Sequence, residues 1–72
     1  MELIDLRRHQ AVSSIVTTAA RQHGLPERVI REVRRYALGK LARGASAHRA
    51  IQAAKTYAAV RAGHATWPQG IA

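Results

Sequence analysis

The stretch that decides the fold is residues 46–58, SAHRAIQAAKTYA. Its apolar residues recur at steps of three and four, which is the repeat of one face of an α-helix. Ser46 is suited to cap the start of this helix, because its hydroxyl can accept a hydrogen bond from the first turn. The sequence therefore predicts a helix with a continuous buried stripe. That stripe consists of Ala47, Ala50, Ile51, Ala54, Tyr57 and Ala58.

Two further helical segments precede this one, and a glycine follows each of the three. Gly24, Gly44 and Gly63 are nearly evenly spaced, and we expect each to end a helix. Pro26 and Glu27 suit the first turn of the middle helix, where a fixed φ and a negative charge are favourable. We therefore predict a mainly α fold in a single small domain, residues 1–72, with three short helices at about 8–23, 26–42 and 46–62.

The two ends of the chain are less regular. Residues 1–7 could form a disordered arm, a short strand, or a first helical turn capped by Asp5, and the sequence leaves these alternatives open. Residues 64–72 are interrupted by Pro68 and a glycine, so we expect an irregular tail. Trp67 in this tail is expected to pack back over the helices or across a dimer.

The first and second helices are predicted to be amphipathic as well. Glu27 is expected to pair with Arg31 along the second helix, and Glu32 with Arg28 or Arg35. The predicted apolar faces are Val12, Ile15, Val16, Ala19 and Ala20 in the first helix, and Val29, Ile30, Val33, Tyr36, Ala37 and Leu41 in the second. The opposite side of the second helix carries Arg28, Arg31, Arg34 and Arg35, with Leu38 among them.

Size and composition indicate a small core and bear on the expected oligomeric state and location of the protein. A 72-residue chain with many alanines buries little area, and without cysteine it cannot form a disulfide. We therefore expect a homodimer. Because no run approaches the roughly 18 apolar residues of a membrane span, and the N-terminal residues are too polar for a secretory signal, we expect no membrane partner and a cytoplasmic location.

The charge of the chain is strongly segregated. The formal net charge is +8, and all four acidic residues lie at or before Glu32. Residues 33–72 contain seven Lys and Arg and no acid, so they supply +7 of the total. With a sequence pI near 11.6, this pattern is typical of a protein that neutralises phosphates.

The cationic part of the chain also has the side chains that contact nucleic acids. Arg, Lys, Gln, His and Thr can donate to phosphates and base edges, and the outer side of the third helix carries these types without an acid. Lys40 and Arg43 precede the N-terminus of that helix, where backbone N–H groups favour phosphate. The candidate nucleic-acid-binding residues are Arg34, Arg35, Lys40, Arg43, His48, Arg49, Gln52, Lys55 and Thr56.

Catalytic and metal motifs do not emerge from the sequence. The histidines at positions 9, 23, 48 and 64 are 14, 25 and 16 residues apart, so no two share the three- or four-residue step that places two imidazoles on one metal. No serine has a recognisable nucleophile motif around it. We therefore expect no enzyme activity, no metal and no cofactor.

Three stretches within residues 3–38 have the order of a known DNA-binding motif. They are residues 3–7, LIDLR; Val12, Val16, Ala19, Ala20 and Gly24; and residues 29–36, VIREVRRY. This order resembles a ribbon-helix-helix domain, the family of small dimeric repressors and plasmid or antitoxin regulators. The resemblance implies dimerisation through an intermolecular ribbon that inserts Leu3, Asp5 and Arg7 into the major groove. The chain departs from that pattern at Pro26, where a Ser or Thr cap is usual.

The sequence favours a small basic nucleic-acid-binding protein, with DNA a better partner than RNA. A transcriptional regulator or a plasmid or phage accessory factor fits this description. The alternative is a small interaction module, an inhibitor or adaptor, that docks its arginine-rich surface on an acidic protein with Leu38 and Tyr36 as anchors. A third class, a structural assembly subunit, remains open because alanine-rich helices also build close-packed assemblies.

Overall fold

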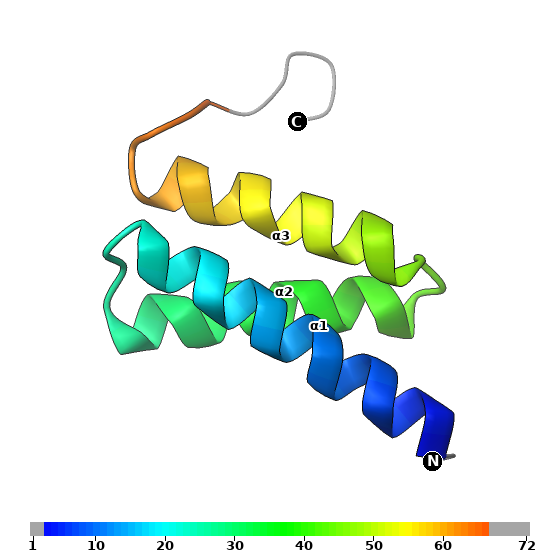
Figure 1. Ribbon diagram of the computed structural model, residues 1–72. Coiled ribbons are helices and arrows are strands. Elements are labelled where there is room, and N and C mark those ends of the chain that lie inside the picture. The colour runs from blue at the N-terminus through cyan, green and yellow to red at the C-terminus, as the bar shows by residue number, and fades with distance from the viewer. Residues whose placement is uncertain (1–2, 67–72) are drawn as a thin grey trace.

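The computed structural model describes residues 3–66, which form a bundle of three helices (Figure 1). Helix α1 spans Leu3–Gln22, α2 spans Glu27–Ala42 and α3 spans Ala47–Arg61. Helix α2 runs antiparallel to the other two, and each helix packs against both others. The predicted mainly α fold is confirmed, and residues 3–66 contain no strand.

The helix boundaries differ from the prediction mainly at the N-terminus. Helix α1 begins at Leu3, so residues 3–7 are part of this helix, whereas residues 1 and 2 of the predicted arm lie outside the described residues. No Gly or Pro interrupts the chain between residues 3 and 22, and each residue added to an existing helix gains a hydrogen bond. Pro26 is the N-cap of α2, with φ −69° and ψ 159°, so the helix starts one residue later than predicted. Residues 64–66 lie outside the helices, whereas Trp67 and the rest of the predicted tail lie outside the described residues.

The glycine stops are confirmed by the backbone. Gly24, Gly44 and Gly63 have φ values of +74°, +97° and +76°, in the left-handed region that glycine adopts without a steric penalty. After α2, Gly44 N–H donates to the carbonyl of Leu41, and Ala45 N–H donates to that of Lys40, both at 3.0 Å. This pair of bonds is a Schellman motif, and it satisfies carbonyls that the helix end leaves unpaired.

The core is small and rich in alanine. Half of its ten buried residues are alanines, and Ile30 is the largest side chain among them. Because α3 contributes only alanines to this buried set, its backbone can approach the other helices closely. The predicted apolar faces are confirmed except at Ile15, which is 45% exposed. The buried residues are Val12, Val16, Ala20, Val29, Ile30, Val33, Ala37, Ala50, Ala54 and Ala58.

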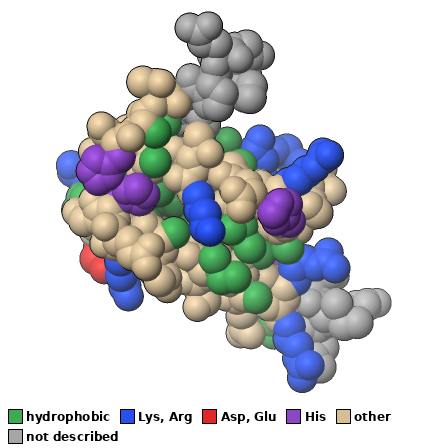
Figure 2. Space-filling model, turned by 45° about the horizontal axis from the view of Figure 1, so that its top comes forward, with side chains coloured by type: hydrophobic (Ala, Val, Ile, Leu, Met, Phe, Trp, Pro, Cys, Tyr) green, Lys and Arg blue, Asp and Glu red, His purple; other side chains and the backbone are tan. Residues whose placement is uncertain are grey.

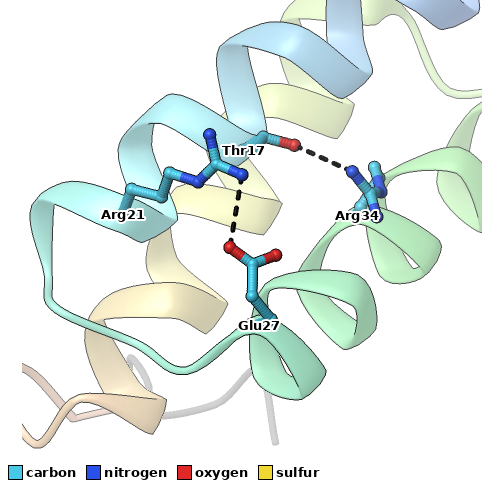
Figure 3. Close-up of polar contacts among 4 residues, drawn as sticks. All are labelled: Thr17, Arg21, Glu27 and Arg34. Carbon is cyan, nitrogen blue, oxygen red and sulfur yellow. Dashed lines mark hydrogen bonds and ion pairs between the residues drawn. The ribbon is translucent and has the colours of Figure 1, made fainter.

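Polar contacts link the helices at the surface. The predicted pairs within α2 are wrong, because both of its carboxylates contact arginines of neighbouring helices. Glu27 Oε1 lies 3.3 Å from Nη2 of Arg21 in α1 (Figure 3), and Glu32 Oε2 lies 2.5 Å from Nη1 of Arg61 in α3. Packing brings these arginines to the two glutamates. Such exposed pairs contribute little stability, about 0–1 kcal/mol, but they neutralise the negative charge of α2.

Candidate nucleic-acid interface

The outward side of α2 carries more cations than either other helix. Arg28, Arg31 and Arg35 are exposed along it, Arg34 is half-buried, and Arg43 directly follows the helix end. Arginine is well suited to phosphate, because its planar guanidinium presents several N–H donors in a fixed fork. We call these five residues, Arg28, Arg31, Arg34, Arg35 and Arg43, the α2 basic face.

Two hollows lie along the α2 basic face. One has a volume of about 480 Å³ and lies on α2 itself, and the other, of about 460 Å³, is a cleft between α2 and α3. Arg35 and Gly39 line both, so the two hollows adjoin. The first is also lined by Arg31, Arg34, Leu38 and Ala42, and the second by Glu32, Tyr36, Arg43 and Tyr57.

Gly39 shapes the ridge between these hollows. The guanidinium Nη2 of Arg43 lies 3.8 Å from the point that a Cβ on Gly39 would occupy. Arg43 therefore folds back along α2, toward the part of the helix that presents Arg35. The two guanidinium groups line the same cleft, and a phosphate there would be within reach of donors from both.

The negative charge near this face is neutralised. Glu32 lines the cleft, but Arg61 binds its carboxylate, and a hydrogen bond with the Tyr57 hydroxyl together with the charge of Glu32 raises the pKa of Arg61 above its ordinary value. Glu27 is paired with Arg21. The chain has twelve Lys and Arg, and the ion pairs among the described side chains involve two of them, so ten remain without a carboxylate partner there.

Two of the predicted site residues take part in packing. Arg34 donates from Nη1 to Thr17 Oγ1 at 3.4 Å, which ties α2 to α1 (Figure 3). Lys40 places its Nζ 5.4 Å from the centre of the Tyr36 ring, a cation–π contact. That ring is in turn stacked on Tyr57, with the ring centres 4.7 Å apart. Arg35 and Arg43 are therefore the more accessible donors of the cleft.

The predicted residues of α3 lie on the outer surface of that helix, and Lys55 lies on its α1 side. His48, Arg49, Gln52 and Lys55 are exposed, and the half-buried Thr56 donates from Oγ1 to the carbonyl of Gln52 at 3.1 Å. Lys55 lines a hollow of about 300 Å³ between α3 and α1, whereas Arg35 and Arg43 line the cleft between α3 and α2. The structure thus divides the predicted surface into two parts.

An apolar area lies between the cations on one side of the molecule. In Figure 2, hydrophobic side chains gather in the middle of the view, Lys and Arg lie over and around them, and acidic side chains appear only at the left margin. Ile15 is among the exposed hydrophobic residues of α1 and lines the hollow with Lys55. This arrangement leaves a surface with both apolar and cationic character beside α3.

Sequence reasoning also missed the contact between His23 and His64. Their Nδ1 atoms lie 2.7 Å apart, although 41 residues separate them in the chain. A search for helical spacing could not find this pair, because each histidine follows the end of a different helix. Residues 3–66 contain no group of three or more His, Cys, Asp or Glu that could hold a metal ion.

Between residues 3 and 66, no helix combines the length and the apolar character needed to cross a bilayer.

Comparison of the chain with protein-family models, with curated proteins and with solved structures gives no match.

Proposed function

We propose that this protein binds double-stranded nucleic acid, DNA in preference to RNA, through the α2 basic face. The observation that carries the proposal is the concentration of arginines on one helix whose carboxylates are both occupied by cations of other helices. A surface of this kind attracts polyanions, and binding is favoured by release of the counterions condensed on the phosphates.

The length of the face suits a phosphate backbone. Arg28 and Arg43 are fifteen residues apart, which corresponds to about 22 Å at the helical rise of 1.5 Å per residue. Each base-pair step of B-DNA advances 3.4 Å along the axis, so this row covers the axial length of about six base pairs. Arg49 and Lys55 are on α3, outside this row, and the proposal assigns them no phosphate contact.

The biological role proposed here is that of a small transcriptional regulator or a plasmid or phage accessory factor. It does not depend on the ribbon-helix-helix resemblance, in which residues 3–7 would be an extended ribbon, because these residues are helical here. The proposal depends on phosphate contacts, which position a protein on a duplex without specifying a sequence.

The alternative partner is an acidic protein, and one observation favours it. Leu38 is half-buried and lines hollows on both sides of itself, one with Arg31 and Arg34 and the other with His9 of α1. An apolar side chain beside arginines could anchor a protein partner. Tyr36 is a weaker anchor than the sequence suggested, because its ring is stacked on Tyr57 and covered by Lys40.

The test is fluorescence anisotropy of a labelled 30-base-pair duplex, titrated with protein at 50, 150 and 300 mM salt, with single-stranded RNA in parallel. Two double variants are compared with the wild type: R31Q/R35Q on α2 and R49Q/K55Q on α3. Each removes two positive charges, so general electrostatics are matched. If Arg31 and Arg35 each contact a phosphate, R31Q/R35Q should reduce the slope of log K against log salt by about 1.8.

The proposal predicts a smaller loss of slope for R49Q/K55Q than for R31Q/R35Q. Equal losses would show that total charge, and not the α2 basic face, governs binding. Absence of binding at 50 mM salt would refute nucleic-acid binding altogether. L38D then tests the acidic-protein alternative. If Leu38 anchors the centre of that interface, L38D should strongly weaken the affinity for the protein partner at every salt concentration.

A further inference from the structure

A pair of histidines closes one end of the bundle. His23 follows the last residue of α1, and His64 lies two residues beyond the C-cap of α3. Their Nδ1 atoms lie 2.7 Å apart and their ring centres 5.0 Å apart. At this separation, Nδ1–H of one ring donates to Nδ1 of the other. The two potential ligand atoms are therefore already adjacent, and a turn of the two rings would direct both lone pairs at one ion.

The electrostatics of this end favour a cation more than the net charge suggests. Helices α1 and α3 run in the same direction, so both present their C-terminal ends here (Figure 1). The helix dipole gives each of these two ends a partial negative charge, against the partial positive charge of one N-terminus, that of α2, at the same end of the bundle. The arginines in the same last turns, Arg21 and Arg61, are bound to Glu27 and Glu32, which reduces their repulsion of a further cation.

We propose that His23 and His64 chelate one divalent late transition-metal ion through their Nδ1 atoms. At bond lengths of 2.0–2.1 Å, two nitrogens at 90° are about 2.8–3.0 Å apart, whereas in a tetrahedral site they are about 3.3–3.4 Å apart. The separation of 2.7 Å is closer to the 90° arrangement. Imidazole nitrogen is a good ligand of Cu²⁺ and Ni²⁺, and these two ions rank above the earlier divalent ions of the first transition row in affinity for such ligands.

Binding requires a change of tautomer but no net loss of a proton. The ring that donates from Nδ1–H must carry its proton on Nε2 instead, so that both Nδ1 lone pairs face the metal. Water would occupy the other coordination positions, because the protein supplies two ligands from the described residues. The proposal stands apart from nucleic-acid binding, since the α2 basic face contributes no ligand.

The test uses untagged protein, with NiCl₂ and CuCl₂ titrated by isothermal calorimetry at neutral pH. Wild-type protein is compared with H23Q, H64Q and the control H9Q/H48Q, in which the proposed pair is intact. One ion per chain should bind to the wild type and to the control. Loss of a partner outside the ligand shell typically weakens metal binding 10–100-fold, so loss of a ligand in H23Q or H64Q should weaken it by at least about tenfold.

Thermal unfolding supplies a second measurement that does not rely on heats of binding. Saturating Ni²⁺ should raise the Tm of wild type and H9Q/H48Q by several degrees, and it should leave the Tm of H23Q and H64Q almost unchanged. Circular dichroism without metal checks that all variants are folded. Unchanged affinity in H23Q and H64Q, one ion per two chains, or no binding at 1 mM Ni²⁺ would each overturn the proposed chelate.

Discussion

Two glycine-to-alanine substitutions test how local backbone conformation stabilises this fold. Gly39 lies inside α2, where glycine is unfavourable, and Gly24 lies in the turn after α1 at φ +74°. A Cβ on Gly39 would meet Arg43 at 3.8 Å, an ordinary contact distance, and a Cβ on Gly24 would meet no atom within 4 Å. Both substitutions add the same methyl group without a clash, so the backbone conformation decides whether the free energy of unfolding rises or falls.

The expected magnitudes follow from these conformations. Alanine is about 0.8–1.0 kcal/mol more favourable than glycine inside a helix, so Gly39→Ala should increase the free energy of unfolding by about that amount. An L-residue in the left-handed region costs roughly 1–2 kcal/mol, so Gly24→Ala should lower it. With an unfolding entropy of about 0.15 kcal/mol/K for 72 residues, the Tm should rise by about 6 °C in Gly39→Ala and fall by roughly 7–13 °C in Gly24→Ala.

Thermal and urea unfolding followed by circular dichroism at 222 nm measure both effects. A lower Tm for Gly39→Ala would refute the contact distance to Arg43 and show that the ridge of α2 has no room for a methyl group. An unchanged Tm for Gly24→Ala would refute the left-handed turn after α1. Gly39→Ala should also keep its affinity for nucleic acid if Arg35 and Arg43 can still reach the cleft.

Three further outcomes are expected. Ile30 is 1% exposed, so Ile30→Val should reduce stability by about 0.5–1.5 kcal/mol in urea unfolding, and Ile30→Ala by roughly 2–5 kcal/mol, which would leave little folded protein. Ser46→Ala should cost about 1 kcal/mol, because the Ser46 hydroxyl accepts from Arg49 N–H at 3.1 Å, whereas the exposed Ser14→Ala should not destabilise. If the expected homodimer forms through the apolar surface at Ile15, light scattering should show a dimer for wild type and a monomer for Ile15→Glu; an unchanged mass would exclude that surface.

The candidate site shows how packing alters a charge pattern. The sequence indicated that residues 33–72 carry a large uncompensated positive charge, and the structure keeps this property. It also moves Arg61 out of that uncompensated set, because Arg61 binds Glu32, whereas the other glutamate of α2, Glu27, binds Arg21 from residues 1–32. Arg35 and Arg43 then line the cleft between α2 and α3, whereas Lys55 lines a hollow between α3 and α1, a division that the residue order alone does not reveal.

The sequence by itself determined the number and type of the helices and, apart from the start of α1, their approximate ends. These features depend on interactions between residues a few positions apart: the three- and four-residue apolar repeat, the Ser46 cap, and glycines where φ becomes positive. The buried faces followed from the same repeat, because a helix in a small bundle must direct its apolar side inward. Even the alanine-rich stripe of α3 could be predicted in this way.

Only the tertiary structure decided which side chains from different helices meet. The Glu27–Arg21 and Glu32–Arg61 pairs, the exposure of Ile15 and the contact between His23 and His64 depend on how three helices rotate and pack against each other. No local rule gives these results, because ion pairs and ring contacts require distances of a few ångströms between residues that are far apart in the chain. Those distances are set once the buried valines and alanines fix the positions of the helices.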